Sequence, residues 1–393
     1  MGGKLEPATA QTVVFLTAEY PPQPGGVGDY THQLALALTQ QGQQVAVLTG
    51  PQTSAPGQSS PSSMPGLQYP IAAWDWRCWA ATRQALQSLR PAWLHIQYQT
   101  GAYGMHPAIN LLPWYLRQTF PIPIVVTFHD LRQPYLLPKA SFLRRWVTLR
   151  LAKDANSVIT TNAEDAQALQ KLGQISSTVI PIGSNIAVAP PANYQREAWR
   201  AKLGIQPNET LLVYFGLLLR SKGVDLLLEA LSHCATLPLR LLLLGGAQDQ
   251  AFAAEVVAQI KRLELTNRVV CTGYVDAQTV SAHLLAADLA VLPFREGCSL
   301  RSGSLLAALS HSLPVLTTFP LTQLDPQLAN AALALFVPPN DSLALAEAIQ
   351  RLVQEPNLRL RLGQKAKLFS RQFQWTTIAA QHSQVYRQLV TIC

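Results

Sequence analysis

The stretch that decides the fold is 288-DLAVLPFREGCSLRSGSLLAALSHSLPVLTT-318. Its apolar run Leu289–Pro293 predicts a short buried strand, and Leu313–Thr318 predicts the next one. Between them, Ser304–Ser310 predicts the first turns of a helix made of small residues. The polar loop Arg295–Gly303 therefore ends at a helix N-terminus, where backbone N–H groups and the helix dipole favour an anion.

Two arginines in this loop, Arg295 and Arg301, add permanent positive charges suited to phosphate. The loop is thus a predicted binding site for a diphosphate. An ordinary strand-to-helix connection with a serine cap would give the same pattern, so both interpretations stay open at this point.

Outward from this stretch, strands and helices alternate along the chain. Residues 11–18, 29–41 and 44–50 predict a strand, a helix and a second strand, and the alternation continues to residue 182. Such βαβ units predict an α/β fold with a parallel sheet covered by helices on both faces. The first half of the chain is therefore a doubly wound, Rossmann-like domain.

A second series of strands and helices follows residues 186–209, which break the alternation. We expect two Rossmann-like domains, 1–190 and 191–375, facing a central cleft, with a last helix at 376–393.

Composition narrows the class of protein. The 393 residues carry a net charge of +8, contain no apolar run long enough to cross a membrane, and hold five scattered cysteines. The N-terminus lacks the apolar core of a signal peptide. We therefore expect a cytoplasmic protein with reduced thiols.

The positive charge is partly local, because residues 132–153 hold six basic residues and no acidic one before Asp154. This segment predicts peripheral contact with an anionic membrane at its inner face, or else a solvated basic surface. Neither a nucleic-acid-binding module nor a repeat of aromatic and basic residues occurs, so we expect no nucleic-acid partner.

Three glycines, Gly25, Gly26 and Gly28, follow the first strand and open a helix. They would let the backbone approach a ligand phosphate, or they form a tight turn. Their spacing is not that of a dinucleotide-binding loop, and no acidic residue ends the second strand, which disfavours a nicotinamide dehydrogenase.

Polar side chains end two neighbouring strands of the first domain. His129 and Asp130 follow one strand, and His95 lies at a similar level on the other. The carboxyl ends of parallel strands present side chains to ligands, although a histidine there is often a hydrogen-bonded structural residue.

In the second domain, Lys222 precedes Gly223 and a predicted helix, which places an ammonium group beside a helix N-terminus. With Arg301 and its serine and glycine neighbours it makes a positive surface rich in hydrogen-bond donors. No Asp-x-Asp pattern occurs, so we expect no metal to bridge a diphosphate.

In this order, several blocks resemble glycosyltransferase family 4. They are PPQPGGVGDYTHQLALAL (21–38), VVTFHD (125–130), VIPIGSN (179–185), YFGLLLRSKGVDLLLEAL (214–231), TGYVDAQTV (272–280) and 293–318. The resemblance implies the GT-B fold, with the last helix crossing back onto the first domain. It also implies a retaining, metal-independent transfer from a nucleotide sugar to a hydroxyl acceptor, with no cofactor.

The resemblance also implies roles for individual residues. His129 would contact the transferred sugar, Lys222 the diphosphate, and Glu296 the sugar hydroxyls. Residues expected at the donor and its phosphates are Gly25, Gly26, Gly28, Gly216, Arg220, Arg301, Ser302, Gly303 and Ser304, and His95 and Asp130 are candidates for the acceptor or sugar.

One departure from the family is clear. The family's second glutamate falls on Ser304 by spacing, or on Ala307 if the following helix is aligned, so this carboxylate is absent. We expect a hexose-type transferase in which Lys222, Arg220 or Arg301 and backbone N–H groups stabilise the departing diphosphate. A catalytically weak scaffold protein and another GT-B enzyme, such as a phosphorylase or epimerase, remain as alternatives.

Overall fold

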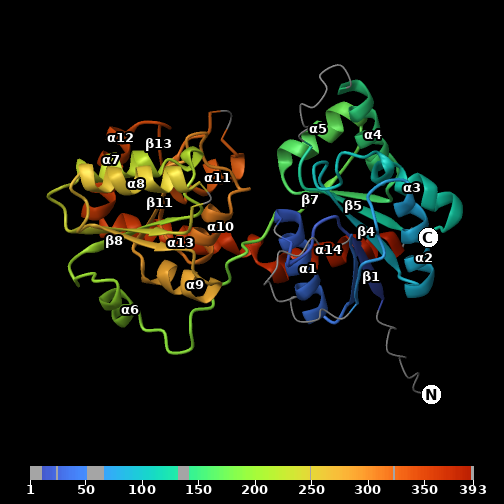
Figure 1. The fold of residues 1–393 in the computed structure, drawn as a ribbon, viewed down its shortest axis with the longest axis horizontal. Helices are drawn as coiled ribbons and strands as arrows, with labels where there is room; N and C mark the ends of the chain where they lie inside the picture. Colours follow the sequence, from blue (N-terminus) through green and yellow to red (C-terminus); the bar gives the residue numbers. More distant parts are fainter. Residues whose placement is uncertain are drawn as a thin grey trace. The chain divides into compact units, whose positions relative to one another are not determined.

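The structure, a computed structural model, describes residues 11–23, 25–50, 66–131, 141–247, 249–321 and 324–390. The chain forms two compact units, each described here by itself. Unit 1 comprises residues 1–183 and 375–393, and unit 2 comprises residues 184–374. Both are Rossmann-like layers of helices around a parallel sheet, as predicted (Figure 1).

Unit 1 is built on a seven-stranded parallel sheet with the order β3-β2-β1-β4-β5-β6-β7. Its central strands are buried and mostly apolar because helices cover both faces of the sheet. The strands are β1 (Thr12–Leu16), β2 (Gln44–Leu48), β3 (Leu67–Gln68), β4 (Trp93–Tyr98), β5 (Ile124–Phe128), β6 (Ser157–Thr160) and β7 (Thr178–Val179).

Two helical layers enclose this sheet, and alternate strand residues face each layer. One layer packs on residues such as Val14, Leu94 and Val126, and the other on Val13 and Val125. The first layer contains α2 (Arg77–Leu89), α3 (Ala108–Thr119), α4 (Ser141–Asp154) and α5 (Ala163–Gly173), and the second contains α1 (Gly26–Gln40) and α14 (Trp375–Val390).

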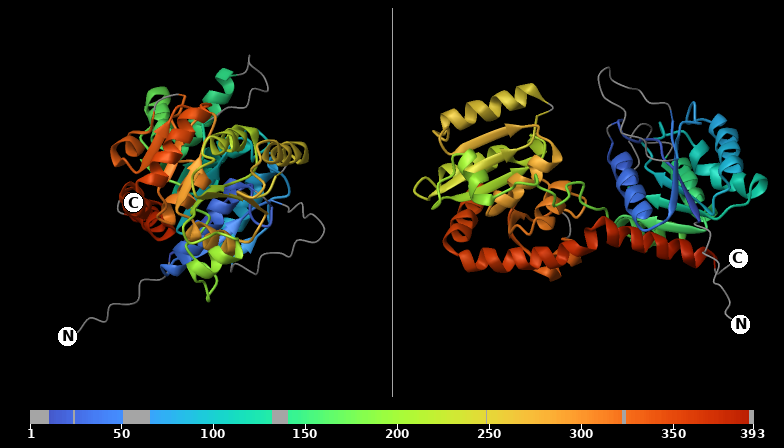
Figure 2. Two further views of the ribbon diagram at one scale, coloured as in Figure 1. Left: turned by 90° about the vertical axis from the view of Figure 1, so that its left-hand side faces the viewer. Right: turned by 90° about the horizontal axis from the view of Figure 1, so that it is seen from below.

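The last helix, α14, belongs to unit 1 and packs beside α1 (Figure 2). Its first residue lies so close to Gly183 that a Cβ there would meet the Trp375 ring at 2.6 Å. The Gln41 side chain donates to the Thr376 carbonyl (2.8 Å). The C-terminal helix therefore completes the core of the unit that contains the N-terminal residues.

Unit 2 has a six-stranded parallel sheet with the order β10-β9-β8-β11-β12-β13. The strands are β8 (Thr210–Phe215), β9 (Leu239–Leu244), β10 (Val269–Gly273), β11 (Leu289–Leu292), β12 (Val315–Thr318) and β13 (Ala334–Val337). The stretch quoted first thus supplies β11 and β12, two neighbours near the centre of the sheet.

Helices cover both faces of this sheet as well (Figure 1). One layer contains α7 (Val224–Ser232), α8 (Gln250–Arg262) and α12 (Ser342–Gln354). The other contains α6 (Arg196–Lys202), α9 (Ala277–Ala286), α10 (Gly303–Ser310), α11 (Pro326–Ala331) and α13 (Pro356–Ser370). Aspartates begin four of them, since Asp249, Asp276, Asp325 and Asp341 accept hydrogen bonds from the first-turn N–H groups.

Sequence periodicity missed α6, which lies inside the stretch 186–209 where the alternation breaks. This short helix is held by tertiary contacts. Trp199 Nε1 donates to His283 Nδ1 (2.9 Å), and the buried Arg200 forms an ion pair with Asp288 (2.9 Å). Periodicity is weak in seven residues, so packing decides the structure here.

No helix in the described part of the chain is long and apolar enough to cross a membrane. Residues 132–140, the first part of the predicted membrane-contact segment, lie outside the described residues.

Candidate functional site

In unit 2, the chain after β8 forms a 3-10 turn, Arg220–Lys222, directly before α7. Gly223 joins them with φ +69°, in the left-handed region. A Cβ at this position would lie 2.1 Å from the Pro293 carbonyl oxygen. Only glycine therefore allows the turn to pack this closely against the loop that follows β11.

This packing brings Lys222 to the loop quoted first. Its Nζ lies 4.6 Å from the centroid of the Phe294 ring, in cation–π geometry. Partial burial lowers the pKa of Lys222. The ammonium group is thus held on a buried aromatic ring at the carboxyl end of the sheet, and Glu296, two residues after Phe294, is exposed.

Arg295 has a structural role that the sequence did not indicate. Its side chain forms an ion pair with Asp225 and donates to the Arg220 carbonyl (3.0 Å) and to Asn340 Oδ1 (2.6 Å). The proposal that Arg295 supplies a free charge for phosphate is therefore wrong in this structure, because its guanidinium ties the Lys222 turn to the loop.

Arg220, predicted at the donor, is exposed and forms an ion pair with Glu255 of α8 (2.6 Å). Its guanidinium also lies 4.8 Å from the Phe252 ring centroid. It would have to exchange this carboxylate for a ligand phosphate. Lys222 has no carboxylate among its recorded contacts in the described residues, so it is the better placed cation.

The N-terminus of α10 is the predicted anion-binding site. The Ser302 hydroxyl accepts from the Leu305 N–H (3.4 Å) and begins the helix. Within the described residues, no hydrogen bond uses the N–H groups of Gly303 or Ser304. The structure thus leaves two backbone donors at a positive helix end, next to Arg301.

The two positions considered for the missing glutamate have different surroundings in the structure. Ala307 is fully buried in the core of unit 2, whereas Ser304 lies beside Gly216 at the end of β8. A Cβ on Gly216 would meet Ser304 Oγ at 2.8 Å. Of these two positions, Ser304 is the one that lies at the candidate site, and it carries a hydroxyl.

A pocket of about 270 Å³ opens beside this position. Its walls include the glycines that end β8 and β9 and the β10–α9 connection, with Gly216, Gly245, Gly246, Tyr274 and Val275 among the lining residues. A Cβ on Gly245 would come within 2.2 Å of the Gly216 carbonyl oxygen, so bare backbone is required here. The mostly apolar walls suit a planar ring such as a nucleobase.

A larger cavity, about 530 Å³, lies at the opposite edge of the same sheet, where β8 begins. Its main charges pair with one another: Asp288 bonds both Arg196 (2.5 Å) and Arg200 (2.9 Å). The smaller pocket, at the carboxyl ends of the strands, is therefore the better candidate for a ligand site.

In unit 1, His129 follows β5 and Gln97 lies on the adjacent strand β4. His129 Nε2 and Gln97 Oε1 are 2.8 Å apart. Burial holds the pKa of His129 well below its ordinary value. The ring is therefore neutral near pH 7, and its Nε2 proton is directed at the amide oxygen.

His95, proposed to contact the acceptor or sugar, is instead a core residue. It is completely buried, and both ring nitrogens are used, by the Tyr386 hydroxyl (2.6 Å) and by Thr127 Oγ1 (2.7 Å). Its β4 position points toward α14 and away from solvent, which corrects the expectation from the sequence.

Asp130 follows His129 and accepts a hydrogen bond from Gln99 Nε2 (3.1 Å). Both residues end their strands, so this pair extends the polar edge formed by Gln97 and His129. Asp130 is half-buried and remains a candidate for a ligand hydroxyl.

A residue that sequence reasoning missed, Glu19, lies beneath the glycine loop. A Cβ on Gly25 would meet Glu19 Oε2 at 2.1 Å, and one on Gly28 would lie 3.0 Å from the Glu19 backbone. Burial and the nearby Asp29 raise the pKa of Glu19, while a hydrogen bond from the Val27 N–H opposes this shift.

The α1 N-terminus, predicted to take an anion, is thus already occupied by a carboxylate of the chain. The signal was available in the sequence, as an acidic residue directly after the first strand. The glycine loop serves close packing over Glu19, and its predicted contact with donor phosphate has no support from this geometry.

Within the described residues, no three His, Cys, Asp or Glu side chains gather in a way that could hold a metal ion. The site residues named above carry amides, an imidazole, hydroxyls, cations and single carboxylates.

Two sequence-family models match the chain. "Glycosyltransferase Family 4" matches residues 24–188, and "Glycosyl transferases group 1" matches residues 195–369. The two matches follow one another along the chain and correspond to the first sheet and the second sheet.

Curated relatives are similar over part of their length. A D-inositol 3-phosphate glycosyltransferase of Xylanimonas cellulosilytica is 27% identical over 244 residues, which is 60% of this chain and 57% of that protein. The putative teichuronic acid biosynthesis glycosyltransferase TuaC of Bacillus subtilis is 29% identical over 242 residues, 60% of this chain and 56% of that protein. The match therefore spans little more than half of each relative.

Among solved structures, Alr3699/HepE from Anabaena in complex with UDP superposes with a TM-score of 0.68 at 18% identity, covering 96% of this chain and all of that one. Two Rossmann-like parallel sheets with this similarity define the GT-B class of glycosyltransferase folds. Within that class, the chain belongs to the family 4-like glycosyltransferases.

Proposed function

We propose that the chain transfers a hexose-type sugar from a nucleoside diphosphate sugar to a hydroxyl acceptor, with retention of configuration and without a metal ion. The observation that carries this proposal is the arrangement in unit 2 of Lys222, the free N–H groups of Gly303 and Ser304, and the nearby glycine-walled pocket. A cation, a helix N-terminus and an apolar slot match the diphosphate and base of a nucleotide.

In this proposal the diphosphate leaves toward Lys222 and the N-terminus of α10. The ammonium group and the backbone donors are already oriented when negative charge develops on the leaving oxygen, which is electrostatic stabilisation. The Phe294 ring and the Arg295 network hold Lys222 in place before the donor arrives. No metal is then needed to neutralise the leaving group.

Glu296 is exposed on the same loop and is proposed to bind hydroxyls of the transferred sugar. Since Ser304 replaces the second carboxylate, the ribose would be held by one hydroxyl and by the backbone near Gly216. We propose a uridine nucleotide as the first donor to test, because HepE, a fold neighbour, has been solved with UDP and with UDP-glucose.

On unit 1, His129 is proposed to orient the sugar through Nδ1, because its Nε2 is used by Gln97. Attack of the acceptor on the face that the diphosphate leaves would give retention without a covalent glycosyl-enzyme. In that step the acceptor oxygen bonds to the anomeric carbon, the bond from this carbon to the diphosphate oxygen breaks, and the acceptor proton passes to the leaving phosphate.

The experiment is a donor-hydrolysis assay, because water can replace an unknown acceptor. Purified protein is incubated with UDP-glucose in the presence of EDTA, and the anomer first released is identified by proton NMR. Release of α-glucose supports retention and metal independence. Release of β-glucose would contradict the proposed stereochemistry, and activity that appears only after Mg²⁺ or Mn²⁺ is added would contradict metal independence.

A further inference from the structure

Three tryptophans on the first helical layer of unit 1 expose about half of their surface. Trp76 directly precedes α2, Trp114 lies on α3 and Trp146 on α4, and they are 49%, 43% and 49% exposed. Large aromatic side chains are costly to leave in water, so three on neighbouring helices indicate a surface used for binding.

Aromatic contacts join α2 to α3. The Trp79 ring lies 5.0 Å from Trp76, 6.4 Å from Trp114 and 4.7 Å from Tyr115, and it stacks on the last. Trp76 also contacts His106 (5.3 Å). The exposed rings at these two helices are therefore parts of one cluster.

Ion pairs continue this surface from α3 to α4. Asp154 lies between Arg150 (2.6 Å) and Arg117 (4.0 Å). Trp114 precedes Arg117 by three residues and Trp146 precedes Arg150 by four, spacings that place each pair on one helix face. The two tryptophans therefore flank the seam between α3 and α4.

The charges of α2, α3 and α4 are almost all positive. Residues 75–90, 108–119 and 141–154 hold only two acidic residues, Asp75 and Asp154, and both are paired with arginines. The basic residues are Arg77, Arg83, Arg90, Arg117, Arg144, Arg145, Arg150 and Lys153.

We propose that this aromatic–basic face, formed by Trp76, Trp114, Trp146 and the basic residues of α2, α3 and α4, docks on the interface of an anionic lipid bilayer. Tryptophan prefers the headgroup level, where its ring is partly apolar and its N–H stays hydrated. Basic side chains near anionic lipids contribute on the order of 1 kcal/mol each. Tryptophan rings and basic side chains on the same helices are therefore the combination that binds to such an interface.

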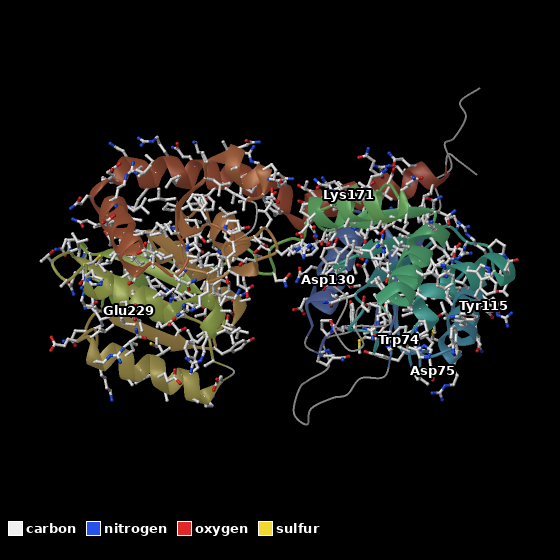
Figure 3. All side chains as sticks on the ribbon, turned by 90° about the horizontal axis from the view of Figure 1, so that it is seen from above. Trp74, Asp75, Tyr115, Asp130, Lys171 and Glu229 are labelled. Carbon is white, nitrogen blue, oxygen red and sulfur yellow. The ribbon has the colours of Figure 1, made fainter. Side chains whose placement is uncertain are left out.

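The face lies apart from the polar edge of unit 1. In Figure 3, Asp75 and Tyr115 lie on one side of the unit, well separated from Asp130. None of the residues named on the face is a candidate site residue, so docking is independent of the proposed function.

The test is flotation of the full chain with vesicles of phosphatidylcholine alone or with 30 mol% phosphatidylglycerol, at two salt concentrations. We expect binding to the anionic vesicles, weakened by salt, and a blue shift of tryptophan emission. The triple variant Trp76→Ala, Trp114→Ala and Trp146→Ala should bind at least tenfold more weakly. Arg145→Glu with Lys153→Glu should lower binding in the same direction.

The matched control replaces three exposed leucines of unit 2, with Leu343→Ala, Leu360→Ala and Leu368→Ala, and should bind as the parent does. Circular dichroism and thermal unfolding show that each variant is folded. Failure of the parent to float with anionic vesicles, or equal binding by the tryptophan variant, would overturn the proposal. Neither outcome would affect the proposed transfer reaction, which the donor-hydrolysis assay tests separately.

Discussion

His129 and Gln97 are joined by a hydrogen bond of 2.8 Å between Nε2 and the amide oxygen across adjacent strands β5 and β4. An amide oxygen only accepts, so Gln97 selects the histidine tautomer with its proton on Nε2. The Gln97 Nε2 atom itself is buried without a hydrogen-bond partner in the described part of the chain. This unpaired donor marks the edge where we place the transferred sugar.

Replacing Gln97 should change the tautomer of His129. In Gln97→Leu we expect turnover to fall about tenfold, because His129 would lose the tautomer that orients the sugar. Nucleotide affinity should stay within twofold, because Gln97 belongs to unit 1 and the proposed nucleotide pocket belongs to unit 2. Nitrogen-15 NMR of the imidazole reports the tautomer directly. A wild-type spectrum showing the proton on Nδ1 would refute this assignment.

Two buried histidines of unit 1, His95 and His382, and the partly buried His129 make its stability sensitive to acid. Burial lowers the pKa of His382 to about 4, and it lowers the pKa values of His95 and His129 as well. In the unfolded chain each would take up a proton near pH 6.5, which the folded state does not do. Stability should therefore fall as the pH drops from 7 toward 4.

For His382 alone the expected loss at pH 5 is about 2 kcal/mol. Urea denaturation at pH 7 and pH 5 measures it, and His382→Gln should lose less on acidification than the parent. The exposed His233→Gln is the control and should keep the parental pH dependence. An unchanged pH dependence in His382→Gln would contradict the argument.

The Gly223→Ala substitution tests the close packing of the Lys222 turn. A Cβ there meets the Pro293 carbonyl, and a left-handed alanine alone costs about 1 kcal/mol or more. We expect lower stability together with weaker nucleotide binding. Gly303→Ala is the matched control: no atom lies within 4 Å of its added Cβ, so stability should change by less than about 0.5 kcal/mol.

The position of Ser304 at the candidate site allows the family's second glutamate to be introduced there by substitution. Ser304→Glu should bind a uridine nucleotide about tenfold more tightly, since a hydrogen bond to a charged group contributes about 1.5–3 kcal/mol. Ser304→Ala should weaken binding slightly. Calorimetric titration of both variants decides the matter, and weaker binding by Ser304→Glu would show that the site has no room for a carboxylate.

Strand-to-helix patterns were sufficient to predict the fold, because alternating apolar strands and helices leave few arrangements for a parallel sheet. They also placed Lys222 and the α10 N-terminus after the carboxyl ends of strands, where the structure has them, while their part in donor binding stays a prediction. What the sequence did not show was which polar groups pair with one another. Arg295 has the same charge as Lys222, but Asp225 and Asn340 use its guanidinium.

The same limit explains His95 and Glu19. A histidine on a strand faces one helical layer or the other, and only the packing of α14 reveals that His95 meets Tyr386, 291 residues away. Glu19 precedes the glycine loop in sequence, and the turn between them folds the loop back over the Glu19 side chain. Contacts between distant residues were the part that local patterns did not contain.

The measurement that tests the central claim most directly is isothermal titration of UDP and UDP-glucose, in EDTA, into the parent protein and Lys222→Ala. We expect micromolar binding by the parent and a loss of about 10- to 100-fold in the variant, since a charge-assisted hydrogen bond to phosphate contributes about 1.5–3 kcal/mol. The exposed Lys365→Ala, also in unit 2, should bind as the parent does. Equal affinity of Lys222→Ala and the parent would contradict the placement of the diphosphate at Lys222.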